Sequence, residues 1–68
     1  MAYKIETTSY GVYIRTPDGN AVRTTAGEVF ETTSRSRAEE VVAYLSQEVV
    51  GNAKKVGPHW LKSTFGVF

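Results

Sequence analysis

Residues 11–22, GVYIRTPDGNAV, decide the fold, because they predict two strands joined by a tight turn. The aliphatic side chains of Val12 and Ile14 alternate with polar or aromatic neighbours, and this period of two is typical of a strand with one buried face. In TPDG, Pro17 presets φ at the second turn position, and Gly19 suits a left-handed backbone because it has no Cβ. We therefore expect a β-hairpin here.

The alternation extends toward the N-terminus, where residues 2–7 (AYKIET) predict another strand. If a tight turn at TTSY joins it to the next strand, Ile5 lies beside Val12. If a one-residue bulge follows TPDG, Ile14 lies opposite Val22. Both registers give the sheet the same inner face, formed by Tyr3, Ile5, Val12, Ile14 and Val22.

The outer face of this sheet is a candidate binding surface. The same registers place Lys4, Tyr13 and Arg23 in a row across three strands, flanked by Arg15 and Glu6. Tyrosine and arginine are enriched at protein-binding hot spots, and they also suit stacking on bases beside phosphate contacts. An ordinary solvated face is the alternative. We favour binding, because an antiparallel sheet covered by one helix leaves its other face open.

The hydrophobic period changes near residue 34, which predicts a helix over about 35–50. Two residues can cap its start: Ser34, or Ser36 with a glutamate three positions later in a capping box. Gly51 suits its end. Before the helix, Val29 and Phe30 are expected to return the chain to the core. The apolar stripe of the helix comprises Ala38, Val41, Val42, Leu45 and Val49.

The tail GPHWLKSTFGVF is aromatic-rich and predicts a final strand. If Leu61, Phe65 and Val67 point inward, Trp60 and Phe68 either wrap an open edge of the core or bury against another chain. The expected fold is a single α+β domain over residues 1–68. Its expected order is β-β-β-α-β, a three-stranded antiparallel meander with one helix across it and a C-terminal strand.

Composition excludes several classes of function. The 68 residues contain no cysteine, so disulfides and thiolate metal sites are ruled out, and oligomerisation remains as reinforcement for a small core. No apolar run approaches the roughly 18 residues of a membrane span, and we expect a cytoplasmic protein. His59 is the single histidine, and no second basic group is placed to activate a nucleophile. We therefore expect no enzyme activity, metal or cofactor.

Residues 11–47 resemble the arm-site DNA-binding domains of phage tyrosine integrases. The resemblance lies in VYIRTPDGNAVR and VFETTSRSRAEEVVAYL: a strand, a Pro-Asp-Gly turn, a second strand, then Phe30 and a threonine leading into a helix with Ala38 and Glu39. It implies DNA binding through the outer face of the sheet. The sequence departs from that pattern at Thr24 and Thr25, where a basic run is usual.

The charge balance sets the order of the two functional hypotheses. Eight Lys and Arg residues against seven Asp and Glu give a net charge of +1, whereas nucleic-acid domains of this size are usually strongly basic. We expect a non-enzymatic protein-binding module, similar in type to small phage or mobile-element accessory proteins that bind and inhibit a host protein, such as a defence system. Self-association as a homodimer and nucleic-acid binding are the alternatives. The predicted partner-binding residues are Lys4, Tyr13, Arg15, Arg23, Trp60 and Phe68.

Overall fold

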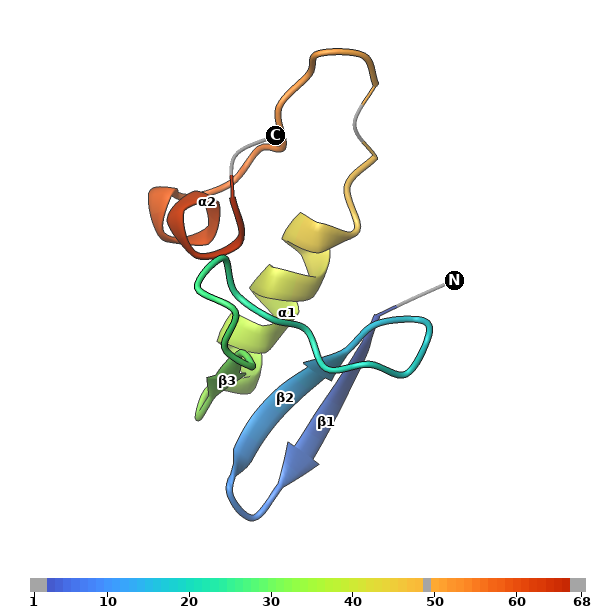
Figure 1. Ribbon diagram of the computed structural model, residues 1–68. Helices are drawn as coiled ribbons and strands as arrows, with labels where there is room; N and C mark the ends of the chain where they lie inside the picture. Colours follow the sequence, from blue (N-terminus) through green and yellow to red (C-terminus); the bar gives the residue numbers. More distant parts are fainter. Residues whose placement is uncertain (1–2, 49, 67–68) are drawn as a thin grey trace.

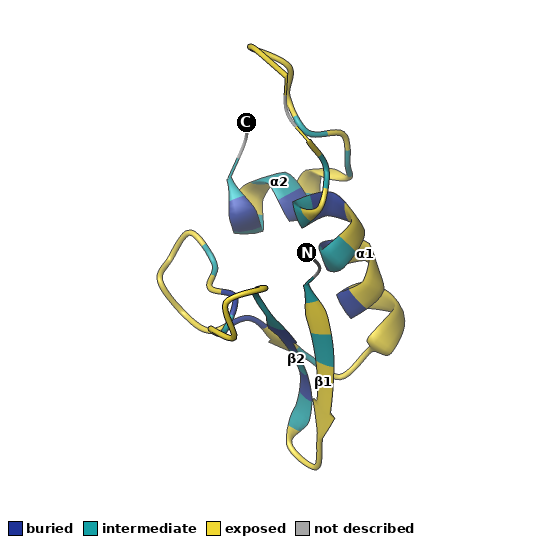
Figure 2. Cartoon of the chain, turned by 90° about the vertical axis from the view of Figure 1, so that its right-hand side faces the viewer, coloured by how far each residue is buried: buried dark blue, intermediate teal, exposed yellow. Residues whose placement is uncertain are grey.

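The chain folds as a small antiparallel sheet followed by two helices (Figure 1). The computed structural model describes residues 3–48 and 50–66. Within them the elements are β1 (Lys4–Thr8), β2 (Gly11–Arg15), β3 (Glu31–Thr32), α1 (Arg35–Leu45) and α2 (His59–Phe65). The strand order is β1-β2-β3, and α1 lies against the inner face of the sheet (Figure 2). This arrangement confirms the α+β class.

The hairpin of β1 and β2 has a different register from the expected one. Ile5 pairs with Ile14, so the prediction that Ile5 lies beside Val12 is wrong. The reason is the turn: the hydroxyl of Thr8 accepts a hydrogen bond from the Tyr10 N–H (3.1 Å) and donates one to the Gly11 carbonyl (3.2 Å). The turn therefore falls one residue later than expected. The pairing shifts by two residues, so every side chain keeps its predicted face.

The TPDG turn has the expected geometry. The Gly19 N–H donates to the Thr16 carbonyl (2.9 Å), and the Gly19 φ of 90° lies in the region that favours glycine. The Val22 N–H then donates to the Ile14 carbonyl (2.9 Å), in agreement with the bulged register.

The third strand comes from a later segment than predicted. Tyr13 pairs with Glu31, so the prediction that Arg23 lies opposite Tyr13 is wrong. After Val22, which lies beside Ile14 of β2, the chain turns away from the sheet in a narrow loop. Within it Arg23 and Val29 form an isolated β-bridge, and the Phe30 N–H donates to the Val22 carbonyl (2.9 Å). This loop returns the chain to the sheet, where Glu31 of β3 takes the place that was expected for Arg23.

Sheet and helices enclose one apolar core, shown in dark blue in Figure 2. The α1 stripe is confirmed in part, since Ala38 and Val41 are buried while Val42 and Leu45 are half-buried. The remaining predicted stripe residue, Val49, lies outside the described residues. Among the described residues, the buried side chains are Val12, Ile14, Val22, Phe30, Ala38, Val41, Tyr44, Leu61 and Phe65.

Helix α1 begins at the first of the two predicted caps and ends earlier than expected. The Ser34 side chain accepts a hydrogen bond from the Arg37 N–H (3.3 Å). The expected end near residue 50 is wrong, because the chain turns back after Leu45. The Gln47 amide then binds the backbone of Val56 in both directions, through Nε2 to the carbonyl (2.6 Å) and from the N–H to Oε1 (2.8 Å).

The last described element is a helix, so the predicted C-terminal strand is wrong. The Pro58 carbonyl accepts hydrogen bonds from the Leu61 and Lys62 N–H groups, which starts the helix. Leu61 and Phe65 are one helical turn apart and both are buried. The Phe65 ring lies 5.3 Å from that of Phe30, so core packing favours the helix. Val67 and Phe68 lie outside the described residues.

Hydrogen bonds from α1 and from the loop after Val22 fix α2 and the segment that follows it. The Tyr44 hydroxyl donates to the Gly66 carbonyl (2.9 Å), and the Thr25 N–H donates to the Thr64 carbonyl (2.8 Å). The helix therefore connects α1 with the loop between Val22 and Phe30. Neither described helix is long and apolar enough to cross a membrane.

Candidate functional site

The outer face of the sheet carries a shallow hollow with a volume of about 350 Å³. Its position follows from the fold, since both helices and the core occupy the other face. We call it the outer-face hollow. It is lined by Glu6, Thr8, Tyr10, Tyr13, Arg15, Ala21 and Val29.

Tyr13 lies in the middle strand of this face, with a glutamate on each neighbouring strand. It pairs with Glu6 on β1 and with Glu31 on β3. Hydrogen bonding to the Glu31 carboxylate raises the pKa of Tyr13, and partial desolvation and the nearby charge act in the same direction. The Tyr13 hydroxyl therefore keeps its proton to a higher pH than an ordinary tyrosine.

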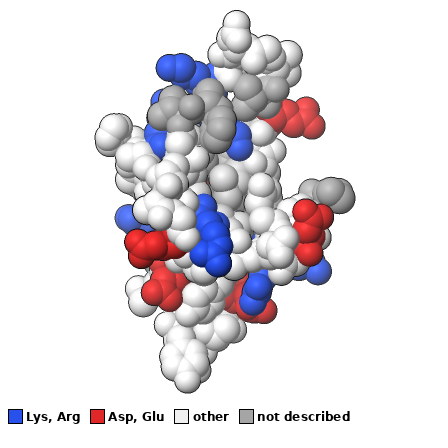
Figure 3. All heavy atoms as spheres, viewed as in Figure 1, with Lys and Arg blue, Asp and Glu red and all other residues white. Residues whose placement is uncertain are grey.

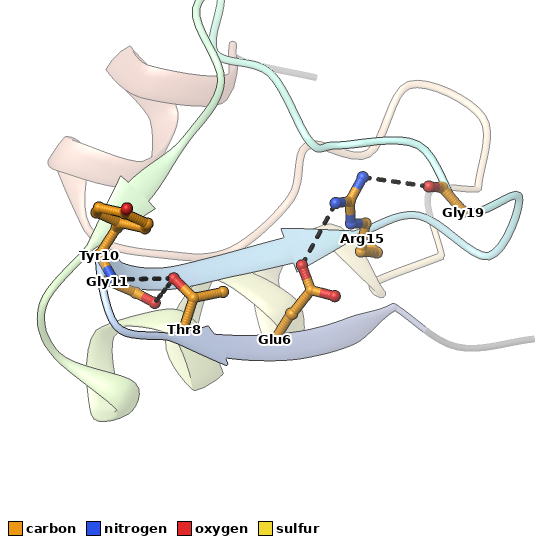
Figure 4. Close-up of polar contacts among 6 residues, drawn as sticks. All are labelled: Glu6, Thr8, Tyr10, Gly11, Arg15 and Gly19. Atoms are coloured by element: carbon orange, nitrogen blue, oxygen red, sulfur yellow. Dashed lines mark hydrogen bonds and ion pairs between the residues drawn. The ribbon is translucent and has the colours of Figure 1, made fainter.

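Arg15 forms a charged wall of the hollow and is held in place at two points (Figure 4). Its guanidinium makes an ion pair with Glu6 Oε1 (3.3 Å) and donates to the Gly19 carbonyl (3.4 Å). Both side chains are partly exposed, so the ion pair adds less than about 1 kcal/mol to stability. It nevertheless orients Arg15 and neutralises its charge locally.

The apolar part of the hollow includes three residues that were not predicted to belong to it: Tyr10, Ala21 and Val29. Tyr10 lies in the β1–β2 turn (Figure 4). Its side chain is 88% exposed, and that of Val29 is 39% exposed. Val29 was expected to enter the core together with Phe30. Strand alternation could have corrected this, because neighbouring residues of an extended segment face opposite sides. Tyr10 could be assigned to the hollow only with the turn placed at residues 9–10.

The predicted row of Lys4, Tyr13 and Arg23 does not form. Lys4 pairs with Arg15 instead, and it is exposed. Arg23 is displaced into the loop, where its guanidinium donates to the Gly27 carbonyl (2.8 Å). Of the sheet residues predicted to bind a partner, Tyr13 and Arg15 line the hollow, and so does Glu6, which was predicted to flank them.

Trp60 belongs to the helical side of the molecule and lies apart from the outer face. Its half-buried ring packs against the core, and the Arg37 guanidinium of α1 stands 4.5 Å from the ring centroid. This contact favours the structural interpretation of Trp60, in which the tail covers the core. Phe68, the other predicted aromatic contact, lies outside the described residues.

Charges of both signs are mixed over the sheet side of the molecule. Figure 3 views this side and shows blue and red side chains interspersed, while the hairpin tip at the bottom of the view carries neither colour. The described part of this face presents no continuous basic stripe of the kind that tracks a phosphate backbone.

Among the described residues, no three His, Asp or Glu side chains gather closely enough to hold a metal ion. Comparisons with protein-family models, with curated proteins and with solved structures gave no match.

Proposed function

We propose that this protein is a non-enzymatic binding module that docks onto a partner protein through the outer-face hollow. The observation that carries the proposal is that two tyrosines, the highly exposed Tyr10 and Tyr13, line the largely apolar outer-face hollow. Tyrosine buries a large area for the loss of only two side-chain torsions, which makes it a frequent hot-spot residue.

The charges around Tyr13 support a protein partner over nucleic acid. Arg15 and Arg23 are already engaged with Glu6 and with backbone carbonyls. A phosphate approaching Tyr13 would also meet the carboxylates of Glu6 and Glu31, and like charges repel. The hollow instead suits an apolar side chain of the partner, with a neighbouring lysine or arginine directed toward Glu31.

We further propose that the partner is a host protein inhibited by this chain, which would then be an accessory protein of a phage or mobile element. The small size and the absence of cysteine from the sequence support this assignment. An inhibitor of this kind needs only one complementary surface.

The test is capture of partners from a nuclease-treated host lysate, followed by affinity measurement with the purified partner. We expect Tyr10→Ala and Tyr13→Ala each to weaken binding about tenfold or more, because hot-spot truncations cost above 1.4 kcal/mol. Val56→Ala is the matched control, since Val56 is 79% exposed and does not line the hollow.

Two results would contradict the proposal. Equal affinity of both tyrosine variants and the parent would exclude the hollow as the docking site. Binding that disappears on nuclease treatment, and that falls steeply with salt on purified DNA or RNA, would identify a nucleic-acid-binding protein.

A further inference from the structure

β1 is the edge strand of the sheet, and its outer edge is open. Figure 2 looks onto this edge, and no other element crosses in front of β1. β1 pairs only with β2 among the described strands. Such an edge presents unpaired N–H and C=O groups that can accept a further strand.

The register identifies which backbone groups face outward. The Ile14 carbonyl accepts a hydrogen bond from the Val22 N–H, so the backbone of Ile14 points away from β1. Its cross-strand partner Ile5 therefore belongs to a non-hydrogen-bonded pair, so the N–H and C=O groups of Ile5 point away from β2. The backbone groups of Thr7, two residues later, point in the same direction. No backbone hydrogen bond joins Ile5 or Thr7 to another described segment.

The charges of β1 make it self-complementary in one antiparallel register. When Ile5 faces the Ile5 of a second copy across a two-fold axis, Lys4 of each copy lies opposite the partner's Glu6. Shifting the axis to Glu6 or to Lys4 would place two like charges opposite each other, which is destabilising. Lys4 makes no ion pair with another described residue, so it is available for this contact.

We propose that two copies of this chain pair through their β1 edges, in the register centred on Ile5, to form one continuous six-stranded sheet. The outward groups of Ile5 and Thr7 complete a ladder with the second copy. On the inner face, the half-buried Ile5 packs against the partner's Ile5. On the outer face, the partner's Lys4 comes beside Glu6, which lines the outer-face hollow, so each hollow gains a residue from the other copy.

A charge swap tests the register. A short strand contact gives a weak interface, so sedimentation equilibrium should cover about 10 μM to about 1 mM protein. We expect a concentration-dependent dimer for the parent. Lys4→Glu should raise the dimer dissociation constant about tenfold or more, because it places two carboxylates opposite each other. Lys54→Glu, in the loop before α2, is the control with the same change in net charge.

The double variant Lys4→Glu/Glu6→Lys restores opposite charges across the axis, and it should return the dissociation constant to within about threefold of the parent value. Within each chain the carboxylate moves to the position paired with Arg15, so Arg15 keeps an acidic neighbour. If the single and double variants weaken the dimer equally, the proposed register is wrong.

Thr7→Pro tests the edge itself. Proline removes the outward N–H of Thr7 without removing a hydrogen bond to β2, because that N–H faces away from β2. We expect a monomer at every concentration, with a circular dichroism spectrum like that of the parent. The proposal is overturned if the parent stays monomeric up to about 1 mM, or if the folded Thr7→Pro variant still dimerises.

Discussion

Tyr13 is the residue on which the chemistry of the outer face depends. Its position in β2 and the direction of its side chain follow from the alternation that the sequence shows. Its neighbours do not, because they depend on which distant segment becomes the third strand. With Glu31 in place of Arg23 beside it, the ring has an acidic partner where a basic one was expected. The chemical environment of Tyr13 therefore depends on which distant segment pairs with β2.

We predict that Glu31→Gln lowers the pKa of Tyr13 toward its ordinary value of 10.0, because the amide keeps a hydrogen-bond acceptor but removes the charge. A folded-state pKa above the unfolded value means that this interaction stabilises the protein below about pH 10 and is lost as pH rises through the folded value. NMR titration of the tyrosine ring carbons measures the pKa directly. Glu28→Gln is the control, and an unchanged Tyr13 pKa in Glu31→Gln would contradict the assigned cause.

At the scale of elements, local sequence signals predicted where helices and turns begin and which strand face is buried. They predicted strand partners and helix ends less well. The TPDG turn and the start of α1 were predicted correctly, because both depend on a few adjacent residues. The end of α1 was wrong, since it depends on Gln47 binding Val56 across a loop. α2 was mistaken for a strand because its aromatic residues favour strands. The spacing of Leu61 and Phe65 was the helical signal available.

The cap of α1 gives a test at this scale. Ser34 has an extended backbone and accepts the Arg37 N–H, so Ser34→Ala should lower the free energy of unfolding by about 1 kcal/mol. Ser36, the alternative candidate in the sequence, lies inside the helix and makes no capping contact with another described residue. Ser36→Ala should therefore change stability by less than about 0.5 kcal/mol. Urea denaturation measures both, and the reverse order would place the cap at Ser36.

At the scale of the whole molecule, stability rests on one core that three separate parts of the chain complete. β2 supplies Val12 and Ile14, and three later parts of the chain complete the core: the loop after β2, helix α1 and helix α2. A domain of this length has a free energy of unfolding of roughly 3–10 kcal/mol. Loss of a large buried side chain costs a substantial fraction of that total. Helix α2 contributes two buried side chains, Leu61 and Phe65.

Leu61 is 2% exposed, so Leu61→Ala leaves a cavity where α2 meets the core, and we expect a loss of about 2–5 kcal/mol. Because this loss approaches the total stability, much of the protein should unfold at 25 °C, and β1 and β2 should unfold together with the helices. Amide NMR spectra report both regions, and the matched control is Lys62→Ala, the next residue along α2, whose side chain is outside the buried core. If the β1–β2 hairpin kept native chemical shifts after the α2 signals had collapsed, the sheet would be stable without α2. The C-terminal helix would then be an accessory to the fold, and the outer-face hollow would not depend on it.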